Sequence, residues 1–172
     1  GCLLILKFSE NNISSKIGNG KIKIKIMYKK ENEKTIIGYT SGVYDLFHVG
    51  HLNLIKNAKG LCDKLIIGVT SDELVSYKNK KAIIPHNERM EIVRNIKYVD
   101  AVVPQNDMDK IKMWERLKFD VMFVGDDWFD TPKWKELDSQ FKSRGVKIIY
   151  FPYTKGVSST IINSTLDGLR ND

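Results

Sequence analysis

The chain has 172 residues and a formal net charge of +7, enough for one α/β domain with a substantial core and too little for two large domains. No apolar run approaches the roughly 18 residues that cross a bilayer, and the first residues lack the basic flank and cleavage pattern of a signal peptide. Two cysteines, Cys2 and Cys62, provide neither a disulfide framework nor metal-ligand spacing, so we expect a cytoplasmic protein without a membrane span.

Residues 1–34 differ in composition from the rest of the chain. They hold eight lysines and three glutamates, so most of the net positive charge lies there. Residues 21–28 alternate between lysines and apolar residues, as a half-buried strand does, whereas residues 9–20 are polar and residues 29–34 resemble a charged linker. We predict a separate basic β extension over residues 1–34, a hairpin or strand pair. We expect its lysine face to be solvated rather than bound to nucleic acid or anionic lipid.

From Thr35 onward, β-prone apolar runs alternate with amphipathic segments, the pattern of a mostly parallel sheet covered by helices on both faces. We therefore predict an α/β domain over residues 35–172, with a five-stranded parallel sheet flanked by helices. The expected strands are 35–40, 64–70, 99–103, 120–124 and 146–151, and the expected helices are 50–60, 72–77, 86–96, 109–118, 132–144 and 159–169. Ligands of such sheets bind at the carboxyl ends of the strands.

The segment from Gly38 to Leu52 leads from the first of these strands through a glycine turn to two histidines at the start of a helix. His48 and His51 are three residues apart and therefore share a helix face, and Gly50 between them leaves room for a ligand to approach the backbone. A helix N-terminus attracts anions, and two imidazoles there suit a polyphosphate. We predict a nucleotide site. The alternative is that one histidine caps the helix and the other is an ordinary surface residue.

Four further segments could carry chemistry, and each also has a purely structural interpretation. The loop 78–81 is either a solvated basic loop or a lysine clamp on phosphates in the transition state. Arg89 pairs either with a phosphate or with a carboxylate. The acidic pair at 126–127 binds a metal, a base or a ribose, or else caps a turn. The hydroxyl groups of 154–160 either cap a helix or hold a phosphate.

In chain order, six blocks of this sequence resemble the cytidylyltransferase family, and most closely its bacterial glycerol-3-phosphate members, over about residues 35–169. The blocks are Gly42-Val-Tyr-Asp45, His48-Val-Gly-His51, the lysine loop 78–81, Tyr98-Val-Asp100, Gly125-Asp-Asp-Trp128 and Thr154-Lys-Gly-Val-Ser-Ser-Thr160. The resemblance implies a Rossmann-like nucleotidyltransferase fold, a homodimer, and a need for Mg²⁺ or another divalent cation whose ligands the sequence does not identify. It implies CMP transfer from CTP to a phosphorylated alcohol by direct in-line attack, with release of pyrophosphate.

The same resemblance implies roles for individual residues. His48 and His51 would stabilise the triphosphate and the leaving pyrophosphate, Lys78 and Lys80 would bind phosphate oxygens, and Asp45 would lie beside the nucleotide. Further nucleotide contacts are expected from Thr40, Ser41, Gly42, Val43, Gly50, Gly125, Asp127, Trp128, Thr154, Gly156, Val157, Ser158 and Ser159, and acceptor contacts from Lys78, Arg89, Lys97 and Tyr153.

The chain departs from the family pattern where an acceptor would bind. Lys97 stands where the family usually has an arginine, which keeps the charge but loses the bidentate fork. Tyr153 and Lys155 replace the usual arginine and glutamate. Glycerol-3-phosphate is the expected acceptor, and another phosphorylated polyol, phosphocholine, phosphoethanolamine, or ATP in place of CTP stay open. A nucleic-acid-binding module related to class I aminoacyl-tRNA synthetases is disfavoured, because the sequence lacks a Lys-Met-Ser-Lys-Ser-like loop.

Overall fold

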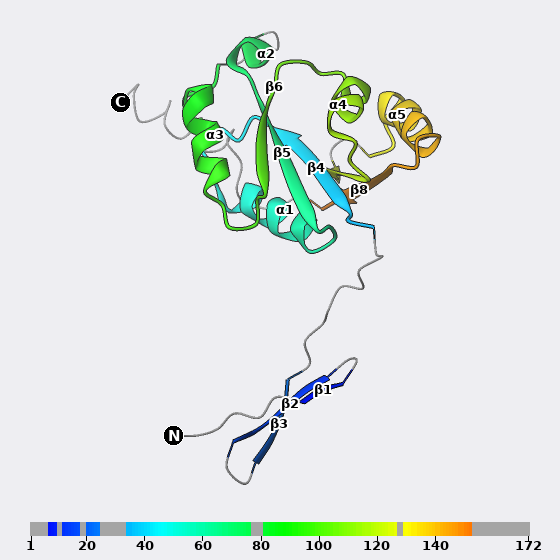
Figure 1. Ribbon diagram of the computed structural model, residues 1–172. Helices are drawn as coiled ribbons and strands as arrows, with labels where there is room; N and C mark the ends of the chain where they lie inside the picture. Colours follow the sequence, from blue (N-terminus) through cyan, green and yellow to red (C-terminus); the bar gives the residue numbers. More distant parts are fainter. Residues whose placement is uncertain are drawn as a thin grey trace. The chain divides into compact units, whose positions relative to one another are not determined.

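A computed structural model describes residues 7–9, 12–17, 20–24, 34–76, 81–126 and 129–152 (Figure 1). Contacts along the chain separate two compact units, Gly1–Lys34 and Thr35–Asp172. Within the described residues, no helix combines the length and apolar character that crossing a bilayer requires.

The first unit contains three antiparallel strands: β1 (Lys7–Ser9), β2 (Asn12–Ile17) and β3 (Gly20–Ile24). The strand expected over 21–28 corresponds to β3. The polar segment 9–20, for which the sequence indicated no strand, contains β2. Its asparagine and serines carry a weak β signal of their own, and β2 is held by backbone pairing with strands on both sides, for example Ile13 with Ile24.

The second unit is an α/β fold around a five-stranded, all-parallel sheet with strand order β6-β5-β4-β7-β8. The predicted α/β fold class is confirmed, and the helix expected over 159–169 lies outside the described residues. The strands are β4 (Ile37–Gly42), β5 (Lys64–Thr70), β6 (Ala101–Gln105), β7 (Val121–Gly125) and β8 (Lys147–Phe151), and the helices are α1 (Val49–Lys59), α2 (Asp72–Ser76), α3 (His86–Arg94), α4 (Lys110–Leu117) and α5 (Pro132–Lys142).

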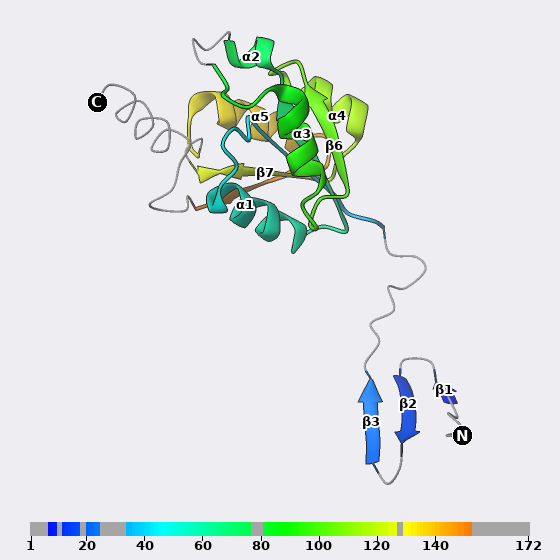
Figure 2. The ribbon, with the colours of Figure 1, turned by 90° about the vertical axis from the view of Figure 1, so that its left-hand side faces the viewer.

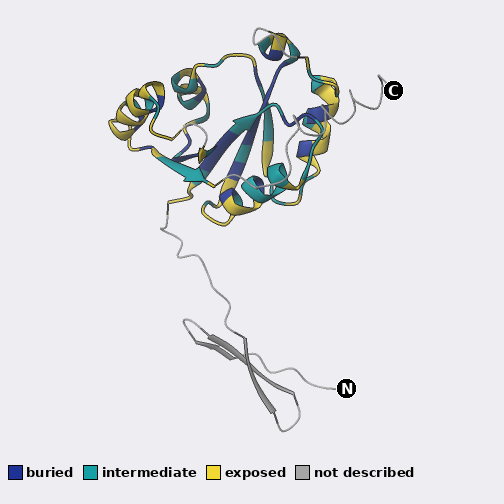
Figure 3. Ribbon diagram, turned by 180° about the vertical axis from the view of Figure 1, so that it is seen from behind, coloured by how far each residue is buried: buried dark blue, intermediate teal, exposed yellow. Residues whose placement is uncertain are grey.

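Helices cover both faces of this sheet, with α1 and α3 on one face and α4 and α5 on the other (Figures 1 and 2). The strands alternate between the two cores: Phe123 packs with Ile55 of α1 and Val93 of α3, and Met122 packs with Phe141 of α5. The buried strands run through the centre, and the helices turn exposed faces outward (Figure 3). From β4 the chain adds β5 and β6 on one side and then β7 and β8 on the other, so the strand order switches between β4 and β7. In sheets of this kind, ligands bind in the crevice at the carboxyl ends of the strands at such a switch point.

A fully buried arginine ties together the loops at that end of the sheet. The Arg89 side chain is 0% exposed, and its guanidinium donates hydrogen bonds to the carbonyl oxygens of Val43, Thr70 and Ile84. It also donates to the Asp72 carboxylate at 2.5 Å. One side chain thereby connects the ends of two strands with the starts of two helices.

Asp72 completes this junction from the first residue of α2. Its second carboxylate oxygen accepts a hydrogen bond from the His86 N–H at 3.0 Å, at the first residue of α3. Partial burial opposes ionisation, but the His86 N–H and the Arg89 guanidinium outweigh it and hold the pKa of Asp72 below its usual value. The carboxylate is therefore ionised at neutral pH, as its pairing with arginine requires.

Arg89→Met should lower the free energy of unfolding by about 3–5 kcal/mol, because it leaves buried carbonyl oxygens without their donor. Urea unfolding at pH 7 measures this. Arg94→Met is the matched control on the same helix, since Arg94 is exposed and pairs with Glu91 at the surface; its effect should stay within about 0.5 kcal/mol. Arg89→Lys, which keeps the charge and loses the fork, should fall between the two. Equal effects of all three variants would mean that the junction contributes little.

Candidate active site

The two histidines of the motif stand together at the start of α1. His48 is the N-cap, with extended backbone, and its Nδ1 accepts a hydrogen bond from the Gly50 N–H at 3.1 Å. The rings of His48 and His51 stack with centroids 3.9 Å apart. The structural alternative thus holds in part, because His48 does cap the helix, but His51 is packed among rings rather than lying alone on the surface.

Burial keeps both imidazoles neutral. His51 contacts the rings of Tyr44 and Phe47, at centroid distances of 5.2 and 5.4 Å. Desolvation, followed by repulsion from His48, lowers the pKa of His51 to about 4, and desolvation also lowers the pKa of His48. The buried Nδ1 of His51 has no hydrogen-bond partner within the described residues. Since His48 Nδ1 accepts a backbone N–H, its neutral ring carries the proton on Nε2, which makes Nε2 a donor.

The turn between β4 and α1 has a constrained backbone. Tyr44 and Leu46 adopt positive φ angles of 56° and 46°, a left-handed conformation that is uncommon for such residues and concentrates at functional sites. The Tyr44 ring folds back under Gly42, where an added Cβ would lie 3.2 Å from the ring. A side chain at this position would press on the ring, which would have to shift by a few tenths of an ångström.

Asp45 has an internal role in this turn. It is 7% exposed, and its carboxylate accepts the backbone N–H groups of Ile83 and Ile84 at 2.9 Å each. Those residues follow the lysine segment in sequence. Whereas the resemblance implied a position beside the nucleotide, the contacts that the structure gives Asp45 join the histidine turn to the segment after the lysines.

The structure describes two of the residues expected to contact the acceptor. Arg89 lies inside the junction described above with no exposed surface, and of the two partners foreseen for it the carboxylate is the one found; its contact with the acceptor stays a prediction. Lys97 lies between α3 and the start of β6, at the amino edge of the sheet, with Nζ 5.1 Å from the centre of the Tyr98 ring. The strand ends that form the site are at the opposite edge, so within this chain Lys97 does not reach it.

The other predicted site residues divide between the end of β4 and segments that the structure does not describe. Thr40 is 1% exposed inside the sheet, whereas Ser41, Gly42 and Val43 line a cavity at the strand end. Gly125 ends β7 beside Phe151. Outside the described residues lie Lys78, Lys80, Asp127, Trp128, Tyr153, Thr154, Gly156, Val157, Ser158 and Ser159.

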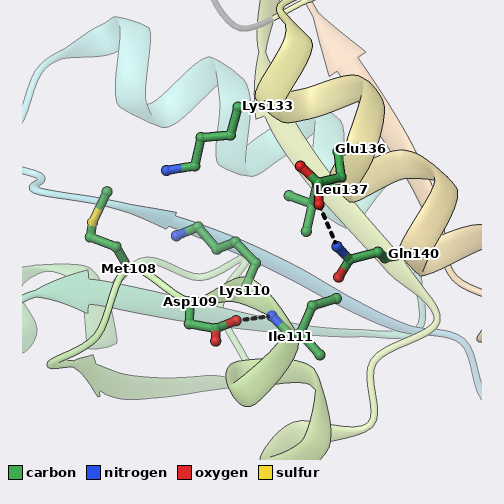
Figure 4. A pocket seen from close by; sticks show the side chains of 8 residues that line it. All are labelled: Met108, Asp109, Lys110, Ile111, Lys133, Glu136, Leu137 and Gln140. Carbon is green, nitrogen blue, oxygen red and sulfur yellow. Dashed lines mark hydrogen bonds between the residues drawn. The ribbon is translucent and has the colours of Figure 1, made fainter.

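Residues that the sequence did not single out complete that cavity, which has a volume of about 170 Å³. Gln105 ends β6, and Lys110, at the start of α4, donates from Nζ to the Ser41 hydroxyl at 2.8 Å. A second pocket, of about 450 Å³, continues between α4 and α5, with Lys110 and Lys133 among its lining residues (Figure 4). The carboxyl-end rule, applied to β6 as it was to the other strands, would have pointed to both Gln105 and Lys110.

The described residues contain no group of three or more His, Cys, Asp or Glu side chains arranged to hold a metal ion.

In the free protein, the His51 ring should titrate with a midpoint near pH 4 in ring-proton NMR spectra. His48→Ala should raise that midpoint, since it removes a like charge, and Asn57→Ala at the exposed end of α1 should leave it unchanged. Because the folded pKa lies below the ordinary value of 6.5, the unfolded chain takes up the proton first, and this histidine weakens the fold as the pH falls from about 6.5 to 4. A midpoint of 6 or above would contradict the burial.

Comparison with known proteins agrees with this geometry. The family model described as cytidylyltransferase-like matches residues 39–165. Glycerol-3-phosphate cytidylyltransferase of Bacillus subtilis (strain 168) is 35% identical over 143 residues, covering 79% of this chain and 99% of the relative. FAD synthase of Thermococcus kodakarensis is 36% identical over 132 residues, covering 72% and 85%.

Among solved structures, the lipopolysaccharide core biosynthesis protein from Thermoplasma volcanium aligns with a TM-score of 0.60 and 26% identity, over 72% of this chain and 100% of that protein. The family match spans the sheet, the histidine turn and the segments after β7 and β8. The chain belongs to the cytidylyltransferase-like family and is a transferase enzyme.

Proposed function

We propose that this enzyme transfers CMP from CTP to glycerol-3-phosphate, giving CDP-glycerol and pyrophosphate. The observation that carries the proposal is the pair of stacked, neutral histidines at the N-terminus of α1, beside the glycine turn that ends β4. The 35% identity to the B. subtilis relative over nearly its whole length supports this choice of substrates.

In this mechanism an oxygen of the acceptor phosphate attacks the α-phosphorus of CTP in line. The new P–O bond forms as the bond to the β-phosphate breaks, and pyrophosphate leaves. His48 Nε2–H donates to the phosphate oxygens on which charge builds up, and His51 beside it provides a second imidazole in a partly water-excluded position. An anion bound next to these rings raises their pKa values, which strengthens the donors as charge develops.

In this proposal the lysines of residues 78–81 supply positive charge to the phosphates. Asp45 fixes residues 83–84, which follow these lysines in sequence, against the histidine turn. We further propose that the nucleotide's own phosphates would hold Mg²⁺, and the ion would supply positive charge that offsets part of theirs. A homodimer and a cytoplasmic location also stay proposals.

The similarity to an FAD synthase favours a second candidate, transfer of AMP from ATP. Both reactions use the same histidines and release pyrophosphate, so the nucleotide and the acceptor distinguish them. The acceptor in either case could be another phosphorylated polyol, phosphocholine or phosphoethanolamine.

Pyrophosphate release measured with Mg²⁺ should be confined to CTP with glycerol-3-phosphate. The assay crosses CTP, ATP, UTP and GTP with glycerol-3-phosphate, ribitol-5-phosphate, phosphocholine and phosphoethanolamine. Turnover with another pair would keep the chemistry and replace the substrates. No turnover with any pair, by a folded protein that binds CTP, would refute glycerol-3-phosphate as the acceptor.

His51→Ala should lower kcat by about 10²- to 10³-fold, because it removes a donor to the developing charge. The midpoint of urea unfolding should fall, because the truncation removes the ring contacts with Tyr44, Phe47 and His48, so kcat is measured under conditions in which the variant is folded. Asn57→Ala, on the exposed part of the same helix, is the matched control and should keep full activity. Near-normal turnover by the His51 variant would rule out the mechanism.

A further inference from the structure

We infer that the cavity at the ends of β4, β5 and β6 is the acceptor subsite, in which Lys110 binds the acceptor's phosphate and Gln105 accepts a hydrogen bond from its hydroxyl group. This inference rests on the proposed function. It names acceptor-binding residues besides those that the sequence predicted.

The cavity lies against the reaction site. Gly42 and Val43, which line it, belong to the turn that leads to His48. Met122, Val124 and Trp134 form another part of its wall and belong to the core on the α4 and α5 face of the sheet. The histidines start α1, which packs on the other face. An acceptor in the cavity and a triphosphate at the histidines would therefore meet across the end of β4.

Gln105 presents a buried acceptor atom there. Its side chain is 2% exposed, and Nε2 donates to the Asp107 carbonyl at 3.1 Å, which fixes the amide orientation. Oε1 has no hydrogen-bond partner among the described residues. A buried acceptor left unsatisfied costs about 1–3 kcal/mol, and such atoms call for an explanation. A ligand hydroxyl that donates to Oε1 would remove this penalty.

Lys110 places a cation in the same cavity. Its Nζ donates a hydrogen bond to the Ser41 hydroxyl at 2.8 Å. Ser41 directly precedes Gly42, the last residue of β4. Lys133 from α5 extends its amine to the same side of the neighbouring pocket (Figure 4). Asp109 and Glu136 also line that neighbouring pocket, so the charge argument rests on the smaller cavity, where Lys110 is the charged side chain among the lining residues and favours an anionic ligand.

These features select among the possible acceptors. A volume of about 170 Å³ lies below the roughly 300–1,000 Å³ of pockets for drug-sized ligands, so the cavity suits a short-chain phosphate rather than a ring system such as a flavin. A hydroxyl group matches Gln105 Oε1, whereas the trimethylammonium of phosphocholine has no N–H to donate. With its phosphate at Lys110, phosphoethanolamine would place its ammonium at Gln105, where an N–H donates to Oε1 as a hydroxyl does. The subsite therefore fits a small phosphate ester whose far end carries a donor, a phosphorylated polyol among them, and disfavours phosphocholine.

Lys110→Met should raise the KM for glycerol-3-phosphate by about 10- to 100-fold, the worth of a hydrogen bond to a charged group, and leave the KM for CTP within about twofold. Lys112→Met is the matched control, because Lys112 is two residues along the same helix, 67% exposed, and paired at the surface with Asp107. It should leave both KM values unchanged.

Gln105→Leu tests the hydroxyl contact separately. Two analogues of glycerol-3-phosphate each lack one hydroxyl group, propane-1,2-diol 1-phosphate and propane-1,3-diol 1-phosphate. The unmodified enzyme should prefer glycerol-3-phosphate over at least one of them by about tenfold or more in kcat/KM. The Gln105→Leu variant should lose that preference, and a merely structural glutamine would not change it.

The outcomes separate the two proposals. If the unmodified enzyme turns over none of the phosphorylated alcohols, the proposed function fails, whatever the variants do. If it is active and Lys110→Met matches Lys112→Met, or changes both KM values equally, the subsite assignment is overturned while the function stands. A preference among the analogues that survives in Gln105→Leu overturns the glutamine's part.

Discussion

The buried guanidinium of Arg89 is the interaction on which the geometry of the site depends. The guanidinium donates hydrogen bonds to the carbonyl oxygens of Val43 and Ile84. The Asp45 carboxylate accepts hydrogen bonds from the N–H groups of Ile83 and Ile84. The histidine turn and the segment after the lysine loop are thus connected twice. A charge with no exposed surface is tolerated only when it is paired, so loss of these partners would leave the Arg89 guanidinium buried at a large cost, and the pairing favours this arrangement of the turn.

With that turn fixed, the histidines keep a chemistry that a free surface histidine would not have. Packing against Tyr44 and Phe47, together with the second imidazole, disfavours the imidazolium. A neutral pair avoids holding two like charges 3.9 Å apart while the site has no ligand. This packing leaves the buried Nδ1 of His51 without a hydrogen-bond partner among the described residues, which costs free energy. A buried polar atom without a partner calls for an explanation, and a functional site is one.

The parallel sheet was predictable because its strands and helices carry their own periodicity, and the glycine turn and the histidines because they form a compact motif. The role of Arg89 was not, since nothing in the polar helix around it signals a side chain with no exposed surface; only tertiary contacts do. Lys97 was misplaced because a charge pattern does not tell which edge of a sheet a loop occupies. Gln105 and Lys110 were missed because each is a single residue outside any motif, and the sheet order alone brings them together.

Two of the three buried side-chain polar atoms without a hydrogen-bond partner among the described residues, His51 Nδ1 and Gln105 Oε1, belong to different faces of the same sheet edge. One lies on α1 with the core that covers β4 and β5 from one side, and the other ends β6 beside a cavity walled by the opposite core. Between them β4 ends at Gly42, where an added Cβ would lie 3.2 Å from the Tyr44 ring. In the arrangement proposed above, the two substrates approach from the two faces and meet at the end of β4, where glycine places no side chain between them.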